Sequence, residues 1–297
     1  MTSVRRMLTG FLLAIAAGFG WGSMGVAAQV MMTDGGFTAQ DLVVLRVFGA
    51  GVLLTLMTLL TERGRVSKLF SDMVLLRDVV IYGLGVLATQ FTFFLAIRDA
   101  GAATAAIMVI TGPLFVIGWT RKPVSILELA AFCLAATGVV LIITKGDLSV
   151  VNFSYSGVLW GLASAACGAF CTLQPGNAVK KLGVNAVVGF GMLFAGIGAL
   201  FVYPPTEIDA VWTWETLAGY LYIIVVGTAL AFVCYLKSLD YVPPAVTTIL
   251  GASEPLTAVI LSVVLLGTSF TPVESLGAVL IFATVFILAM REGRRRT

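Results

Sequence analysis

The sequence predicts an all-α polytopic membrane protein with ten transmembrane helices arranged as two inverted five-helix repeats. Its 297 residues are 59% hydrophobic and only 11% charged, whereas a soluble domain carries about 25% charged residues because its surface faces water. A spanning helix takes ~20 apolar residues, so the composition accommodates roughly eight to ten of them. Charge-free runs of helix length and an internal repeat complete the prediction.

Long charge-free runs identify the spans as helices, since a membrane barrel would instead show alternating segments of ~10 residues. One run extends from Met7 to Thr33 and another from Leu182 to Thr206. Charged and turn-rich segments divide the chain into ten expected spans: 9–31, 42–60, 75–97, 101–119, 126–144, 156–176, 184–203, 216–236, 244–266 and 273–290. The first is too long for the apolar region of a secretory signal, so we expect it to be retained.

Basic residues predict the orientation of these helices. With the N-terminus placed in the cytoplasm, three of the 18 Lys and Arg residues, Arg46, Arg98 and Lys145, fall toward the outer side. The remaining fifteen (18 − 3) are cytoplasmic, which is a strong positive-inside bias. The outer loops instead collect acidic residues, among them Glu207 and Asp209. We therefore expect both termini in the cytoplasm.

An internal repeat relates the two halves of the chain. The stretch 96–114 aligns without gaps with 238–256 at a shift of 142, so that Pro113 matches Pro255. Glu128 and Glu274 occupy corresponding places near the start of the helix that follows each stretch. We expect five-helix halves at 1–147 and 148–297, together forming one transport domain. Because five is odd, two such halves cross the bilayer in opposite directions, as in many secondary transporters.

Several motifs make the sequence resemble the EamA-type transporters of the drug/metabolite transporter superfamily. They include the small-residue run Ala17–Gln29 with its Trp21-Gly22 pair, the stretch Asp41–Gly51, and Ser253-Glu254-Pro255. The chain departs from the family where Leu-Gly-Glu often follows the ninth helix, because it has Leu266-Gly267-Thr268. The corresponding turn after helix four also lacks Leu-Gly.

The resemblance implies a secondary carrier of ten helices in a bacterial inner membrane, with both termini cytoplasmic. Its alternating-access cavity would lie between the two five-helix halves. Members of the family move small metabolites, amino acids or drugs, commonly outward and often driven by protons. The implied partners are a small-molecule substrate, possible coupling protons (H⁺) and the lipid bilayer, and the protein could be a monomer or a homodimer.

Other functional classes receive little support from the composition. A net charge of +3 leaves no basic face for a nucleic acid. The absence of histidine excludes imidazole catalysis and histidine-ligated metals, and all four cysteines lie in apolar runs, which favours buried thiols over a redox or metal site. We predict no metal and no cofactor. We also predict no enzyme activity, because no cluster of His, Asp or Ser-Lys groups is visible.

Glu254 is the first candidate for substrate binding or coupling. It lies about midway along an apolar run, some ten residues from either end, and a carboxylate at such a depth costs about 2.5 to 3.5 kcal/mol on insertion scales. It could bind a proton or the ammonium group of a substrate. The alternative is a structural carboxyl that is hydrogen-bonded beside Pro255.

Other polar and kinked positions extend this candidate set. Pro113 and Pro255 each remove a backbone donor and are expected to break their helices at equivalent depths, although packing kinks would look the same. Side-chain amides in apolar runs should face another helix or a cavity. Among Gln29, Gln90 and Gln174, Gln90 is the strongest candidate for substrate binding because its repeat counterpart is Phe232.

Aromatic and hydroxyl side chains complete the candidates. Trp21 lies in mid-helix and could form a substrate wall, the alternative being core packing. The remaining candidates are Thr111, Phe94 and Tyr222. Arg46, one turn inside the outer end of its helix, is expected to extend toward the outer surface; pairing with Asp41 or with a substrate carboxylate are the alternatives.

The sequence therefore predicts a secondary active transporter that works by alternating access and exports small amphipathic metabolites, such as amino acids or drugs, by proton coupling or exchange. A facilitative channel or a sensor would show the same composition. A membrane-embedded enzyme is the weaker alternative.

Overall fold

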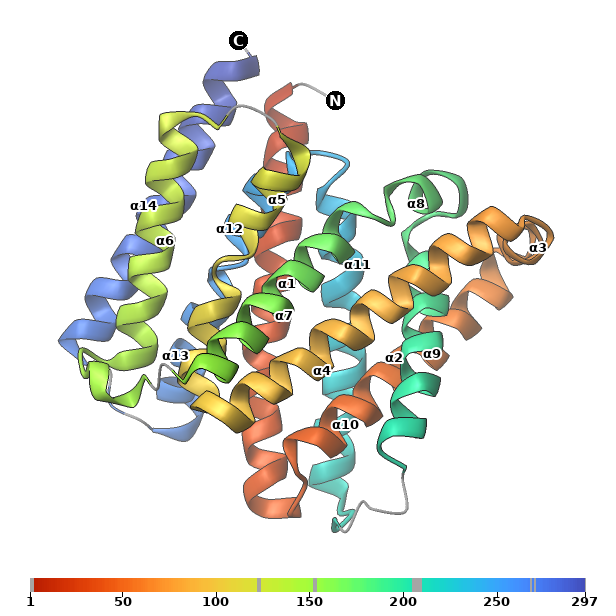
Figure 1. Ribbon diagram of the computed structural model, residues 1–297, viewed down its shortest axis with the longest axis horizontal. Helices are drawn as coiled ribbons and strands as arrows, with labels where there is room; N and C mark the ends of the chain where they lie inside the picture. The colour runs from red at the N-terminus through yellow and green to blue at the C-terminus, as the bar shows by residue number, and fades with distance from the viewer. Residues whose placement is uncertain are drawn as a thin grey trace.

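The computed structural model describes residues 3–121, 124–151, 154–204, 210–267, 269 and 271–296, which form helices joined by short connections (Figure 1). Glu207, Asp209 and Thr268, which entered the arguments on orientation and family, lie outside these residues, as does Lys122, one of the fifteen basic residues expected in the cytoplasm. The helices of the first half are α1 (Ser3–Gly35), α2 (Ala39–Thr61), α3 (Arg63–Ser71), α4 (Met73–Val109), α5 (Gly112–Thr120) and α6 (Ile126–Thr144). A 3-10 turn, η1 (Leu148–Val150), follows.

The second half of the chain also consists of long helices with short interruptions. Its helices are α7 (Tyr155–Leu173), α8 (Gly176–Leu182), α9 (Val184–Val202), α10 (Trp214–Ile224), α11 (Ala231–Ser238), α12 (Pro244–Leu250), α13 (Ser253–Leu266) and α14 (Pro272–Arg296), with a π-helical segment η3 (Val225–Leu230) between α10 and α11. The π-helical segment is continuous with its neighbours, so 214–238 forms one span.

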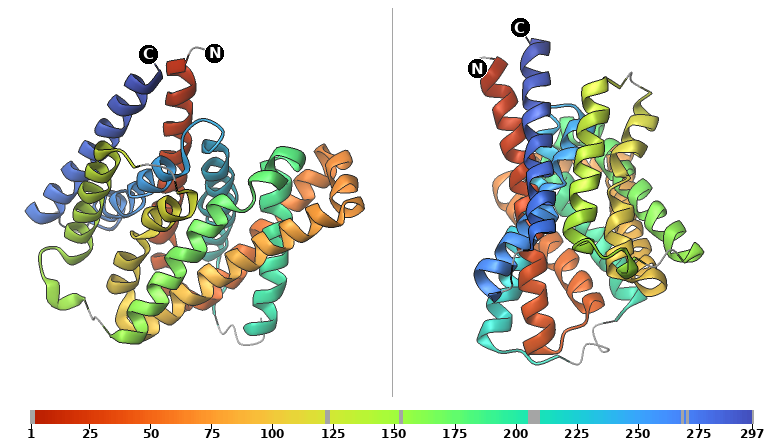
Figure 2. Two further views of the ribbon diagram at one scale, coloured as in Figure 1. Left: turned by 45° about the horizontal axis from the view of Figure 1, so that its top comes forward. Right: turned by 90° about the vertical axis from the view of Figure 1, so that its left-hand side faces the viewer.

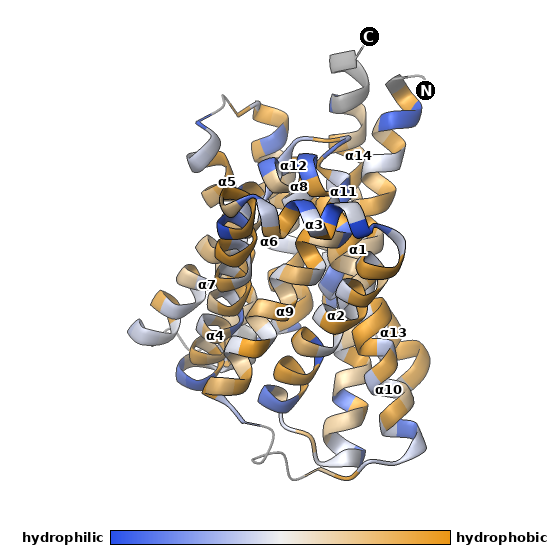
Figure 3. Cartoon of the chain, turned by 90° about the vertical axis from the view of Figure 1, so that its right-hand side faces the viewer, coloured by the Kyte–Doolittle hydropathy of each residue, from blue (hydrophilic) through white to orange (hydrophobic). Residues whose placement is uncertain are grey.

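Nine helices of the described residues are long and apolar enough to cross a membrane. The tenth expected span, 101–119, corresponds to a shorter apolar helix, Thr104–Thr120. At the boundary before it, Gly101 leaves the helical conformation at a φ of 83°, and a turn at Ile110 and Thr111 separates α4 from α5. The prediction of a polytopic helical membrane protein is confirmed, and hydrophilic residues gather mainly toward the two ends of the molecule (Figure 3).

Four helices begin with reciprocal caps that the sequence encodes locally. In α6, the Glu128 backbone donates to the Ser125 hydroxyl at 3.2 Å while the Glu128 carboxylate accepts from the Ser125 backbone at 2.9 Å. Thr271 and Glu274 repeat this arrangement before α14, and α2 and α10 carry the same kind of cap. Such boxes satisfy backbone donors that a helix start would otherwise leave unpaired in the membrane.

The helices pack chiefly in pairs drawn from the two halves. α2 lies against α9, α4 against α7 and α9, α1 against α11 and α13, and α6 against α14. The α6–α14 pair forms one side of the molecule in Figures 1 and 2. The N-terminal end of α1 and the C-terminal end of α14 lie at the same end of the protein (Figure 1).

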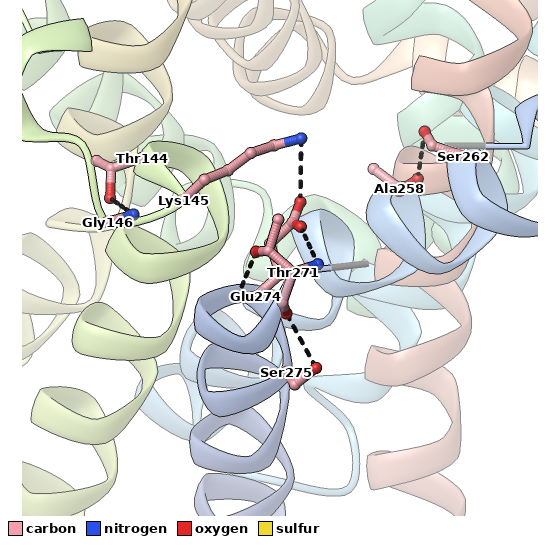
Figure 4. Close-up of polar contacts among 8 residues, drawn as sticks. All are labelled: Thr144, Lys145, Gly146, Ala258, Ser262, Thr271, Glu274 and Ser275. Carbon is pink, nitrogen blue, oxygen red and sulfur yellow. Dashed lines mark hydrogen bonds and ion pairs between the residues drawn. The ribbon is translucent and has the colours of Figure 1, made fainter. Parts of the chain in front are cut away.

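Ion pairs join both ends of the α6–α14 pair. Glu128 at the start of α6 binds Arg291 near the end of α14 at 2.9 Å, and Lys145 at the end of α6 binds Glu274 at the start of α14 at 3.3 Å (Figure 4). The two helices therefore run antiparallel, with each acidic cap bonded to a basic residue at the opposite end of its partner.

Candidate functional site

A cavity of about 570 Å³ lies at the centre of the helix arrangement, within the 300–1,000 Å³ range typical of small-molecule sites. Residues from α1, α2, α4, α5, α6, α7, α11, α12 and α13 line it, so both halves of the chain contribute. The lining is mainly aliphatic and aromatic. Among the described residues that line it, Arg46 and Glu254 are the two that carry charge.

Glu254 is held in the first turn of α13 by a tight approach to α1. Its backbone N–H donates to the Gly251 carbonyl at 2.9 Å, and α13 lies so close to α1 that a Cβ at Gly22 would meet the Thr257 Cβ at 2.7 Å. The Glu254 side chain is exposed within the cavity. It makes no hydrogen bond or ion pair of its own with another described residue, so the carboxylate is available to a ligand.

Arg46 faces the cavity from α2, and the expectation that it extends toward the outer surface is wrong. The residue is 8% exposed, and its Nη1 lies 3.8 Å from the Met24 Sδ on α1. Its charge interacts with that of Glu254 through space, without the short contact of an ion pair. Asp41 instead accepts from the Thr38 backbone at 2.7 Å and caps α2.

An aromatic cluster forms one wall of the cavity. The Trp21 ring lies 5.3 Å from the Phe232 ring at an interplanar angle of 75°, and 5.2 Å from the Tyr235 ring. The Tyr235 hydroxyl lies 3.0 Å from the Thr172 hydroxyl, which ties α11 to α7. Trp21 thus packs α1 against α11 and also lines the cavity, and Tyr235 connects the cluster to α7.

Gln90 lines the same cavity from the middle of α4. Its side-chain amide makes no hydrogen bond with another described residue, although an amide in an apolar setting needs partners. Phe232, its expected counterpart in the sequence repeat, also lines the cavity, from α11. The lining therefore includes a polar amide on α4 and an aromatic ring on α11.

The two prolines lie directly after interruptions of the helix pairs α4–α5 and α12–α13. Turns at Ile110–Thr111 and Gly251–Ala252 precede Pro113 and Pro255, respectively, and both prolines line the cavity. A proline cannot donate to the carbonyl four residues earlier, so the Val109 and Gly251 carbonyls lack their α-helical partner, and the Gly251 carbonyl accepts from the Glu254 backbone instead, at 2.9 Å. Such backbone is tolerated at membrane depth where it faces protein or a wet cavity.

The remaining candidates lie outside this cavity. Gln29 is exposed on α1, the Gln174 Nε2 donates to the Asp78 carbonyl at 2.9 Å, and the Thr111 hydroxyl donates to the Met108 carbonyl at 2.7 Å. Phe94 is half-buried one position beyond the lining residue Phe93.

Tyr222 belongs to a second cavity, of about 820 Å³, between α1, α10 and α13. Its hydroxyl donates to the Ser23 Oγ at 2.8 Å. Tyr222 and Glu254 therefore line two different cavities, both of which border α1.

Sequence reasoning missed that Arg46 lies at the cavity and did not single out the α7 residues Ser164 and Thr172. An arginine within an apolar span was an available signal. Ser164 carried no such signal, because its role depends on a tertiary contact: its hydroxyl donates to the Thr89 carbonyl of α4 at 3.0 Å.

Comparison with known proteins places the chain among membrane transporters. Residues 155–290 match the model of the EamA-like transporter family. The chain is 31% identical to the uncharacterized inner membrane transporter YicL of Salmonella typhimurium, over 99% of each chain. It is 25% identical to the threonine/homoserine exporter RhtA of Escherichia coli K12, over 72% of each chain.

The fold also has a close counterpart among solved structures. One crystal structure matches with a TM-score of 0.76 at 16% sequence identity, covering 97% of this chain and 99% of that chain. At this identity the match concerns the fold alone. With the full-length similarity to YicL, these findings confirm the family indicated by the sequence motifs: the chain belongs to the EamA-like transporters of the drug/metabolite transporter superfamily and is a membrane transporter.

Proposed function

We propose that this protein is a secondary active exporter of small amphipathic metabolites, with amino acids as the leading class, and that it works by alternating access. The observation that carries the proposal is the central cavity, which is lined by both halves and by two broken helices, and holds a carboxylate, Glu254, that is free to bind a ligand. Midplane sites of secondary transporters are built from such discontinuous helices. The activity for which RhtA is named, threonine and homoserine export, supports both the direction and the class.

The packing supports two inverted repeats, 1–147 and 148–297, as the moving units. A pseudo-twofold axis would pair α2 with its equivalent α9 and α6 with its equivalent α14, and both pairs are in contact. The same axis would convert the contact of α1 with α13 into that of α7 with α5, which also exists. The crossed ion pairs of α6 and α14 follow the same symmetry.

Coupling in this proposal depends on Glu254. A carboxylate in a largely apolar cavity can hold a proton or a cationic group, and each state has a different charge to carry across the membrane. Protons entering from outside would then exchange for substrate leaving the cell. In this proposal both termini lie in the cytoplasm, which the distribution of basic residues in the sequence supports.

Counterflow in proteoliposomes tests the transport activity. Vesicles loaded with unlabelled amino acid should accumulate the radiolabelled form only when they contain the protein, because a carrier exchanges bound substrate across the membrane. Empty vesicles and vesicles with an unrelated membrane protein are the controls. Absence of counterflow for amino acids, drugs and nucleotide-derived metabolites alike would contradict the proposal.

A further inference from the structure

Two opposite charges face the central cavity, one from each half of the chain. Arg46 comes from α2 and Glu254 from the start of α13. Neither charge is neutralised by a direct ion pair with a described residue, although the two interact through space. The described lining residues offer no third charge, so a ligand in this cavity meets one cation and one anion.

Arg46 in particular is arranged for a ligand. A guanidinium has five N–H donors, and among the described residues the hydrogen-bond partner of this side chain is the Met24 sulfur, a weak acceptor, at 3.8 Å. More than nine-tenths of the residue is buried. An unpaired buried charge is costly, and a carboxylate bound to the guanidinium in bidentate geometry would relieve that cost.

Glu254 is the anion of this pair and is arranged for a cationic group of a ligand. Its carboxylate can accept from an ammonium group, and its backbone is fixed by the close approach of α13 to the glycines of α1. A simple amine would pair with Glu254 and leave Arg46 unpaired. A simple acid would do the reverse, so each would bind without relieving the second charge.

We propose that Arg46 and Glu254 together form a receptor for a zwitterion, with the substrate carboxylate on Arg46 and the substrate ammonium on Glu254. The ligand class is therefore a free α-amino acid, whose two charged groups share one carbon, with its side chain against the apolar wall that includes Trp21 and Phe232. This inference rests on the proposed transport function and assigns the substrate contacts of the same cavity.

A bridging substrate would also connect the two halves. It would neutralise a charge on α2 and a charge on α13 at the same time, so the loaded cavity would tolerate occlusion better than the empty one. Coupling of substrate occupancy to closure is what an alternating-access carrier requires.

Matched ligand sets test this receptor on the purified full-length protein. Thermal stabilisation would be measured with L-leucine, with 3-methylbutylamine, which lacks its carboxylate, and with 4-methylpentanoate, which lacks its ammonium; phenylalanine and threonine would be tested with their own amine and acid counterparts. Stabilisation reports binding to the folded state. We expect at least one amino acid to bind about tenfold or more tightly than both of its counterparts, because each lacks a charge-assisted hydrogen bond.

Single variants then assign each charge. Arg46→Gln should lower affinity for the amino acid and the acid about tenfold and leave the amine unchanged, whereas Glu254→Gln should lower affinity for the amino acid and the amine and leave the acid unchanged. Arg46→Lys should restore part of the binding of the acid. Arg98→Gln is the matched control, since Arg98 is on α4 and pairs with Asp99 at 2.7 Å.

The possible outcomes separate the two proposals. If no amino acid binds more tightly than its amine and its acid, or if Arg46→Gln weakens amine and acid equally, the zwitterion receptor is wrong, even where counterflow of another substrate persists. If the expected binding pattern appears without counterflow, the receptor stands and the transport proposal fails. Size-exclusion profiles matching the wild type establish that each variant is folded.

Discussion

Burial without a nearby counter-charge distinguishes Arg46 from the other basic residues whose side chains the structure describes. Lys145 and Arg291 bind carboxylates directly, at 3.3 and 2.9 Å, and Arg98 pairs with the neighbouring Asp99. Arg46 instead lies against a thioether, with Glu254 farther away. Side chains that serve the fold are satisfied by the fold, so an unsatisfied cation inside a cavity indicates a binding role.

The proposed coupling role of Glu254 predicts a change in the pH dependence of transport. In Glu254→Gln the side chain can no longer gain or lose a proton, so the rate of amino acid exchange should vary much less with pH than in the wild type. The rate itself should fall about tenfold, because a charge-assisted contact to the substrate ammonium is lost. The measurement is counterflow in proteoliposomes over a series of equal internal and external pH values.

Tyr82, Tyr235 and Cys171 are further ionisable side chains among the described lining residues, so the control has to keep a carboxyl at position 254. Glu254→Asp, which keeps a titratable group, is therefore the control and should retain a pH-dependent rate. An unchanged profile in Glu254→Gln would remove this residue from the coupling mechanism.

At the scale of elements, the α6–α14 pair shows how small residues and capped ends create a rigid unit. The helices cross where a Cβ at Gly138 would meet the Gly277 carbonyl oxygen at 2.7 Å, and one at Gly277 would meet the Gly138 carbonyl oxygen at 2.6 Å. Small residues allow such close approach of helix backbones in membranes. The ion pairs at both ends fix the register of the crossing.

The crossing predicts a selective effect of adding one methyl group. Gly277→Ala should destabilise the protein by about 1–3 kcal/mol, since the new Cβ would press on backbone that cannot rotate away. Gly118→Ala in α5 is the matched control, because nothing lies within 4 Å of a Cβ there. Alanine is also favoured over glycine by roughly 0.5–1 kcal/mol inside a helix.

Thermal unfolding in detergent, followed by tryptophan fluorescence, measures both glycine variants. We expect the midpoint of Gly277→Ala to fall and that of Gly118→Ala to stay or rise. Equal midpoints for the two variants would show that the crossing is looser than described.

At the scale of the whole molecule, the proposed orientation predicts which loops a membrane-impermeant maleimide can reach. In a background whose four native cysteines are replaced, Ser149→Cys, between α6 and α7, should react in intact cells. Ser71→Cys, at the end of α3, should react only after the membrane is permeabilised. Both positions are exposed, so accessibility depends on the side of the membrane. The reverse pattern would invert the orientation.

Much of the architecture could be predicted from sequence because partitioning into lipid depends on composition. Runs such as Met7 to Thr33 are long and charge-free, and nine helices of the described part of the chain qualify as spans. The boundary near residue 101 was predicted, whereas its backbone form, with Gly101 at a φ of 83°, was not, because hydropathy does not report backbone conformation.

Site residues were harder to predict, since apolar helices carry little information on which face meets a cavity. Trp21, Gln90 and Glu254 meet at the cavity, whereas Gln29 is exposed on the outside of α1 and Tyr222 lines another space. In the sequence, a glutamine that lines the cavity cannot be told from one on the outside of the molecule, because both lie in apolar runs. The helices that pack around each glutamine decide which of the two it is.

The sequence by itself determined the spans, the family and the repeat of Pro113 and Pro255, because these depend on residue type and spacing along one chain. Only the tertiary structure decided that Arg46 turns inward and shares a cavity with Glu254. The physical reason is that these residues lie 208 positions apart (254 − 46) on helices from different halves. Their meeting depends on how α1, α2 and α13 pack, which neither local propensity nor hydropathy encodes.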